Sequence, residues 1–437
     1  MFETIRNAFR IPELRKRLLF TFLMLIVVRI GSQLPVPGVD PNVFAQLFAN
    51  TGDAMNFFDA ITGGSFEQMS VFALNITPYI TSSIIIQLLT IAFPALEEMQ
   101  RDGEQGRKKL TQITRYLTIA LALLESGAMA YGFGRNGYLT SFSFLPIVTV
   151  VVSLTAGSAI LMWIGERITE KGIGNGISIV LIINIISRLP VDLTSLYEQF
   201  IKGKAISWGI LSGVVIAAII IAVVVLVVLL QNAERRIPVQ YSKKLVGGNR
   251  ASGGTSTYIP LKVNTGGVIP VIFAQSLMQT PVIIAALIGK SNGTGIGYEI
   301  LRMLSQGNWF NRNDFKYTIG ALVYFLLIIA FAYFYTTITF NPAEISENMK
   351  KQGGFIPGIR PGKPTSDYLS AVLNKIILIG AIGLAIVSML PIFMNGMFNA
   401  NVSFGGTSII IIVGVVIETL KQIESQMMVR NYKGFLN

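Results

Sequence analysis

The chain has 437 residues, of which 52% are hydrophobic and only 13% are charged, and its formal net charge is +12. An ordinary soluble domain is about one quarter charged, so this composition indicates a membrane protein. The chain contains no cysteine and no histidine, which excludes disulfides, thiolate nucleophiles, the usual zinc sites and Ser-His-Asp chemistry.

Ten segments read as membrane spans, because about 20 mostly apolar residues cross a bilayer. Hydropathy and turn signals predict spans near 18–34, 71–93, 113–133, 144–164, 174–189, 207–230, 266–288, 317–340, 372–393 and 405–422. A basic run, Arg15-Lys16-Arg17, precedes the first span, and no small-residue cleavage site follows it. We therefore expect a retained span and not a removed signal peptide.

Basic residues in the loops predict the orientation. With the N-terminus inside, the cytoplasmic segments hold 25 of the 35 Lys and Arg residues and the outer loops hold eight. This asymmetry predicts that both termini are cytoplasmic. Ten spans divide into two halves of five, the second inverted relative to the first. The expected organisation is an N-terminal segment (1–17), a first half (18–189), an outer hinge loop (190–206), a second half (207–422, with cytoplasmic loops 231–265 and 341–371) and a C-terminal tail (423–437).

The first outer segment, residues 35–70, is too long for a simple connector. Within it, Phe57, Phe58 and Ile61 share one helical face, and Gly63 and Gly64 end that short helix. Such a helix is too short to span the bilayer. It lies at the membrane interface or folds back into a cavity, and the residues alone leave both readings open.

The turn 172–176 resembles a phosphate-binding loop only superficially. It follows no strand and lacks the spacing and lysine of a nucleotide-binding loop, so it is predicted to be the turn before a helix. Residues 235–263 alternate apolar and polar positions around a glycine-rich centre, which predicts a basic β-ribbon projecting from the membrane.

The other long cytoplasmic loop begins with a helix signal. Asn341 is a predicted N-cap for a helix starting at Pro342, and Gly353-Gly354 stops that helix. The prolines that follow hold the chain extended and present Arg360 at an exposed tip. An exposed arginine there suits a protein partner or an anionic lipid, or it is one more inner positive charge.

Several short motifs, in consistent order from Pro12 to about Tyr432, resemble the SecY family, the central channel subunits of the bacterial protein translocase. They are Pro78-Tyr79-Ile80, 83–89 (SIIIQLL), 104–109 (EQGRKK), 172–178 (GIGNGIS), 260–264 (PLKVN), 267–273 (GVIPVIF), 358–362 (GIRPG) and 405–408 (GGTS). The resemblance implies an all-α polytopic fold: ten transmembrane helices in two pseudo-symmetric inverted halves around an hourglass pore. It also implies a channel that moves unfolded secretory polypeptides across the membrane and releases signal helices laterally into lipid.

The family pattern assigns roles to particular residues. It implies an apolar pore ring, in which Leu181 replaces an expected isoleucine at little cost in volume or polarity; the ring is Ile76, Ile80, Leu181, Ile185, Ile272 and Ile411. The plug helix falls near 55–64, with Phe57, Phe58, Ile61, Gly63 and Gly64. The lateral gate lies between spans two and three and spans seven and eight, with Thr81, Ser83, Ile84, Gln87 and Gln275. Surfaces for a motor or ribosome include Arg250, Lys350, Lys351 and Arg360.

The implied partners are the small membrane subunits SecE and SecG, the SecA motor ATPase, the ribosome with its nascent chain, signal peptides, secretory polypeptides and membrane lipid. The implied location is the bacterial plasma membrane. We expect no enzyme, cofactor or metal, and energy must come from a partner because the sequence has no nucleotide-binding loop.

An apolar ring makes physical sense, since a narrow apolar constriction excludes water and fits around a moving chain without specific attraction. The weakly bonding side chains Thr81, Ser83 and Gln87 could hold a gate that an apolar signal helix displaces, and Gln275 is a candidate partner of Ser83. Plain helix packing is the simpler explanation of the ring, and hydrogen bonding to the local backbone is the simpler explanation of the polar side chains. A secondary transporter with inverted repeats is an alternative, although only Glu125 lies well inside a span. An insertase or scaffold without a through-pore is another.

Overall fold

The computed structural model describes residues 6, 8–39, 62–135, 137, 139, 141–203, 206–241, 256–287, 295–310, 314–398 and 406–433. Within these ranges, one helix lies at each of the ten predicted spans: α2 (Pro12–Gly31), α5 (Thr77–Ala92), α7 (Gly103–Arg135), α8 (Phe144–Lys171), α9 (Gly176–Phe200), α10 (Ile206–Asn232), α11 (Ile269–Leu287), α13 (Ile319–Thr339), α15 (Lys363–Phe398) and α16 (Gly406–Lys433). By length and composition alone, six helices in the described ranges can cross a membrane. A seventh is the pair formed by α5 and α6 (Pro94–Arg101), which is bent by 107°.

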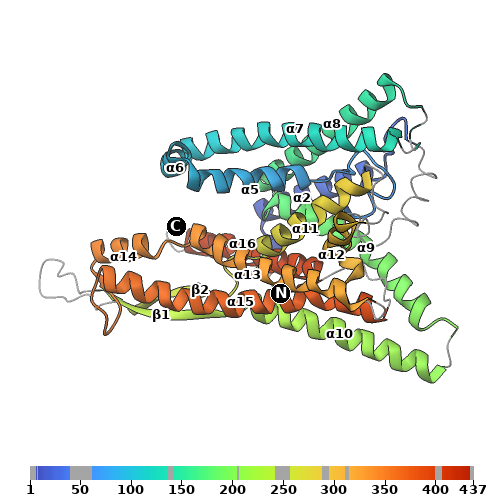
Figure 1. Cartoon of the computed structure of the whole chain (residues 1–437). Helices are drawn as coiled ribbons and strands as arrows, with labels where there is room; N and C mark the ends of the chain where they lie inside the picture. The colour runs from blue at the N-terminus through green and yellow to red at the C-terminus, as the bar shows by residue number, and fades with distance from the viewer. Residues whose placement is uncertain are drawn as a thin grey trace, which may run out of the picture.

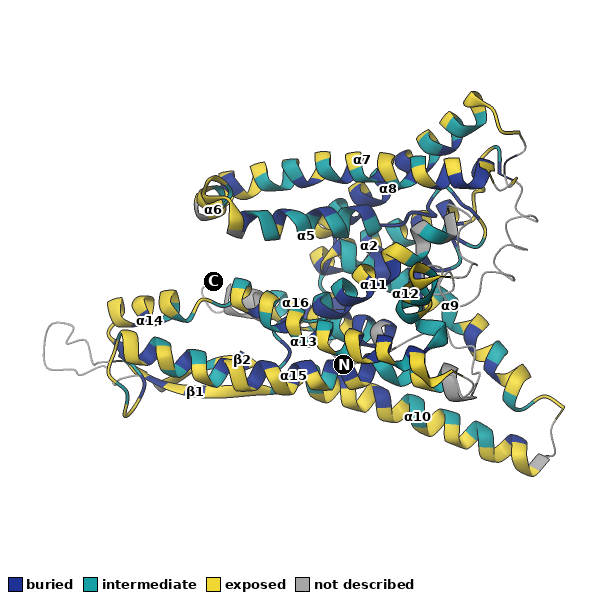
Figure 2. Ribbon diagram, viewed as in Figure 1, coloured by how far each residue is buried: buried dark blue, intermediate teal, exposed yellow. Residues whose placement is uncertain are grey.

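The helices form two groups that meet along the middle of the molecule (Figure 1). The helices α5 to α8 lie on one side, the helices α10, α13 and α15 lie on the other, and α2, α9, α11 and α16 lie between them. Each group has its own buried cluster, around Phe133 and Leu154 in the first half and around Trp309 and Tyr324 in the second. Most side chains along α10 are exposed (Figure 2), and only 11% of the most apolar stretch of this helix is buried inside the protein. Such exposure is expected for a helix that faces lipid.

Two helix boundaries differ from the sequence prediction. The second span was expected from residue 71, but residues 63–76 form turns and one isolated β-bridge at Ser70, and α5 begins only at Thr77, followed by Pro78 in its first turn. The fifth span was expected to end at 189, but α9 continues through Pro190 to Phe200. Leu196 packs into the core of the second half, and this contact stabilises the extra turns past the proline. The expected outer loop 190–206 therefore shortens to the few residues between Phe200 and Ile206.

The predicted β-ribbon is confirmed and carries a third strand. Strands β1 (Glu234–Tyr241) and β2 (Ser256–Lys262) pair antiparallel, and β3 (Gly354–Phe355) pairs with β1 on its other side. The core beneath this sheet includes Ile237 and Val239. Because β3 comes from the loop between α13 and α15, this loop and the loop between α10 and α11 form one folded unit.

The predicted local signals around this unit and before α9 are also confirmed. Asn341 caps α14 (Pro342–Lys351), since its side-chain oxygen accepts hydrogen bonds from the backbone N–H of Ala343 and Glu344. Asn175 caps α9 in the same way, so residues 172–176 are the turn before a helix. Outside the spans lie α12 (Ile296–Leu304) and two 3-10 turns, η1 (Gln306–Asn308) and η2 (Phe315–Thr318).

Candidate pore constriction and gate

A cluster of apolar side chains lies where the two halves meet. Five of the six predicted ring residues belong to it, and they come from α5, α9, α11 and α16; we call them the constriction cluster: Ile80, Leu181, Ile185, Ile272 and Ile411. Leu181 and Ile185 are one turn apart on α9 and project from one face. Leu181 is 7% exposed and Ile411 is 5% exposed, so the side chains from the two halves close on each other.

Ile76 lies apart from the constriction cluster. Because α5 begins at Thr77, Ile76 occupies the N-cap position and its side chain turns into the first half. There it is fully buried among residues of α2, α8 and α9, including Val28, Leu161 and Val180. Ile80 touches both this core and the constriction cluster, so Ile76 packs behind Ile80 and not beside it.

The predicted plug is described only at its C-terminal end, because Phe57, Phe58 and Ile61 lie outside the described residues. Gly63 and Gly64 both lie in a turn and adopt positive φ values, +67° and +84°, while the residues before Thr62, where the short helix was predicted, lie outside the described residues. The carbonyl of Gly63 accepts hydrogen bonds from Arg29 Nη1 (3.4 Å) and Ser187 Oγ (3.3 Å). This end of the segment is therefore seated on α2 and α9.

The predicted gate residues on α5 are accessible: Gln87 is exposed, and Thr81, Ser83 and Ile84 are half-buried. Gln275 on α11 is buried, and its Nε2 donates to Oε1 of Gln306 at 3.2 Å. The partner of Gln275 is therefore Gln306, which lies in η1 of the same half, and not Ser83. The seam between the halves includes contacts of α11 with α7.

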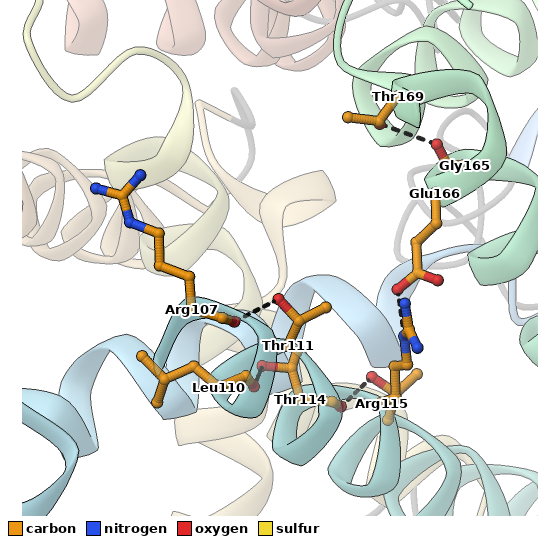
Figure 3. A network of polar contacts seen from close by, with 9 residues as sticks. Arg107, Leu110, Thr111, Thr114, Arg115, Gly165, Glu166 and Thr169 are labelled. Atoms are coloured by element: carbon orange, nitrogen blue, oxygen red, sulfur yellow. Dashed lines mark hydrogen bonds and ion pairs between the residues drawn. The ribbon is translucent and has the colours of Figure 1, made fainter. Parts of the chain in front are cut away.

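Sequence reasoning missed a polar cavity that both halves line. It measures about 620 Å³ and is lined by residues of α5, α7, α8, the turn before α9, and α16, among them Tyr79, Asn175 and Glu418. At its wall, Arg115 Nε of α7 donates to Glu166 Oε1 of α8 at 2.7 Å (Figure 3). No periodicity in the sequence relates two residues 51 positions apart, so no sequence signal identified this ion pair.

The predicted docking residues lie around the three-stranded sheet, except Arg250, which is outside the described residues. Arg360 is exposed in a tight turn that Thr365 stabilises, since Thr365 Oγ1 donates to the Arg360 carbonyl at 2.8 Å. Lys350 and Lys351 are exposed on α14. Lys351 pairs with Glu347 at 3.0 Å, and this hydrogen bond lowers the pKa of the Glu347 carboxyl below its ordinary value. Neither Arg360 nor Lys350 forms a salt bridge with another described residue, although Lys350 lies close enough to Glu347 to contribute to the lowering of its pKa.

Ten helices, most of them long and apolar, with an apolar cluster where the two halves meet, define a polytopic membrane protein. The chain belongs to the SecY family, whose sequence profile matches residues 70–420. It is 45% identical to the protein translocase subunit SecY of Streptomyces galbus over 454 aligned positions that cover 100% of both chains.

Solved channels share the fold. One is a SecY channel described for its plug domain, which stabilises the closed state of that channel and maintains its membrane seal; the TM-score is 0.62 at 19% identity, covering 94% of this chain and 92% of that one. Another is Sec61 in the canine ribosome–channel complex from the endoplasmic reticulum, with a TM-score of 0.61, 19% identity and the same coverage.

Proposed function

We propose that this protein is the channel subunit of a bacterial protein translocase, moving unfolded secretory polypeptides across the plasma membrane and releasing signal and transmembrane helices sideways into lipid. The observation that carries the proposal is the constriction cluster, in which α5 and α9 of the first half meet α11 and α16 of the second. The relatives of this chain are named as translocase subunits, which supports the same function.

The constriction cluster seals the passage by excluding water. A narrow apolar ring blocks ions through dewetting, and it binds no passing side chain specifically. β-Branched isoleucines suit this role because their rotamers are restricted while the side chain stays compact. Ile76 braces Ile80 from within the first half. In this proposal, therefore, five residues line the constriction and one supports it.

The plug is the segment that precedes Gly63. Its C-terminal end is held by Arg29 and Ser187, so displacement of the plug pivots at Gly63 and Gly64, whose positive φ values favour glycine. A polypeptide reaches the constriction through the cavity that Tyr79 and Glu418 help to line. Signal helices leave along the seam between α5 with α7 and α11 with α13.

Energy comes from partners. The exposed Arg360 turn and Lys350 on α14 form a basic surface that suits the SecA motor or the ribosome. The Sec61 neighbour was solved in a ribosome–channel complex, which supports a ribosome as a partner. SecE and SecG are the expected membrane subunits, and α10 offers a long apolar face to them or to lipid. Both termini lie in the cytoplasm, since most basic loop residues fall on that side.

Disulfide crosslinking to a stalled secretory chain tests the proposal. The protein has no native cysteine, so each introduced cysteine is unique. We expect single variants Ile80→Cys and Ile272→Cys to crosslink to a cysteine in the stalled chain. Ile76→Cys is the matched control, because Ile76 sits on the same segment but faces the core of the first half. Equal crosslinking at Ile76, or none at the other two positions, contradicts the assignment.

A further inference from the structure

Two glutamines are buried on α11, where apolar side chains would pack at lower cost. Gln275 is 3% exposed and Gln279 is 1% exposed, and they lie one turn apart on one face of the helix. Their neighbours on this face, Val271, Ala274 and Met278, pack into the core of the second half. The amide of Gln275 reaches Gln306 of its own half, and Gln279 follows it one turn farther along the helix.

Gln306 lies in η1 and reaches this face of α11 from a segment that Trp309 anchors to the second half. Directly after Gln306, the indole of Trp309 is fully buried, and its Nε1 donates to the Met303 carbonyl at 2.7 Å. The indole fills the space that Gly320 leaves open on α13, since a Cβ there would lie 2.3 Å from Trp309 Nε1. Tyr324 packs beside it, with ring centroids 5.5 Å apart. Gln306 thus projects toward α11 from a fixed support.

The three amides form only one hydrogen bond among them, from Gln275 Nε2 to Gln306 Oε1 at 3.2 Å. Four of their buried polar atoms have no partner among the described residues: Gln275 Oε1, Gln279 Nε2, Gln279 Oε1 and Gln306 Nε2. Two of these atoms are donors and two are acceptors, so the set has matched capacity for further pairing. Buried amides left unpaired are costly, and their retention calls for an explanation.

We propose that Gln306 is a positioning residue for α11, with two docking positions on that helix. In the state described here it holds α11 through Gln275, which fixes the rotation of the helix and seats Ile272 in the constriction cluster. Gln279 presents the same amide one turn farther along, and it takes over the bond with Gln306 when α11 moves during opening. The unpaired atoms are the partners that this second state uses. The inference rests on the proposed channel function, because it assigns α11 to the moving gate.

The first test measures the position of α11 directly. A double variant, Ile272→Cys with Ile411→Cys, is reconstituted as the full chain in bilayers, and the rate of disulfide formation under mild oxidant is followed. Gln306→Ala should lower this rate at least about three-fold, the factor that corresponds to an average membrane-helix hydrogen bond of ~0.6 kcal/mol. Asn308→Ala is the matched control: it lies in the same 3-10 turn, but its amide donates to the Arg302 carbonyl within the outer segment. Equal rates in the two variants overturn the proposal.

The second test separates positioning from general stability. Gln275→Leu should reproduce the effect of Gln306→Ala, and combining the two should add nothing, because both remove one bond. Gln279→Leu should leave the resting disulfide rate unchanged and slow the translocation of a secretory protein. Additive effects of the first pair, or a Gln279→Leu variant that translocates normally, refute the two-position mechanism. We expect Gln306→Ala and Asn308→Ala to unfold at the same temperature. That result excludes a folding defect as the cause of the lower disulfide rate in Gln306→Ala. The disulfide readout does not depend on whether Ile272 seals the pore, so the outcome remains separate from that of the constriction assignment.

Discussion

Replacing Ile411 with asparagine tests whether the constriction cluster keeps the channel closed. Ile411 is 5% exposed and packs with Leu181 and Ile185 across the boundary between the halves. Burying an isoleucine side chain is worth about 1.5–3 kcal/mol, and an amide buried there without a partner costs about 1–3 kcal/mol. Even the lower ends of both ranges destabilise the closed state by about 2.5 kcal/mol. Because 1.4 kcal/mol is a factor of ten, Ile411→Asn should raise the open fraction about 60-fold.

The assay is ion conductance of the purified channel in planar bilayers, combined with export of a secretory protein that carries a defective signal sequence. Both should rise in Ile411→Asn. The matched control is Ile410→Asn, since Ile410 is the next residue on α16 and is 1% exposed, but it packs in the core of the second half. That variant should lower the unfolding temperature without increasing the conductance of folded channels. Equal conductance in the two variants, or no increase in Ile411→Asn, would refute the reasoning.

Four further substitutions probe the turn at Gly63 and Gly64 and the loop between α13 and α15. Gly63→Ala should raise the resting conductance, because the φ of Gly63 is +67° and the new Cβ would lie 2.4 Å from the Asn184 carbonyl oxygen. Gly64→Ala should raise the conductance less, since that substitution carries only the backbone cost of roughly 1–2 kcal/mol. Arg360→Glu should abolish motor-driven translocation while leaving resting conductance unchanged, which an ATP-dependent import assay into vesicles measures. Asn341→Ala should destabilise α14 by about 1 kcal/mol, and hydrogen exchange at Ala343 and Glu344 should rise.

Local signals in the sequence were sufficient for most of the fold. Long apolar runs predicted ten helices, the turn 172–176 marked one helix start, and Asn341 marked another because N-capping depends only on neighbouring residues. The boundary at Pro190 was wrong for a physical reason: the helix continues because Leu196 docks into the distant core of the second half. A hydropathy profile depends only on the residues of one segment, so it carries no information about such tertiary contacts.

The candidate site was predictable to a similar degree. Resemblance to a family placed five isoleucine and leucine residues that the structure brings together. It could not place Ile76, because the direction of that side chain depends on where α5 begins, and the turn at Asn75, with a φ of +52°, leaves no recognisable sequence pattern. The bond between Gln275 and Gln306 and the ion pair of Arg115 with Glu166 were also missed, since each joins residues that only the packed helices bring together.

The short strand β3 has a mechanical consequence. Strand β1 follows α10 almost directly, β2 leads into α11, and β3 lies between α14 and α15, so a single sheet ties together the adjoining ends of these helices in the second half. A load applied at the Arg360 turn is therefore shared by these helices and does not bend one loop alone.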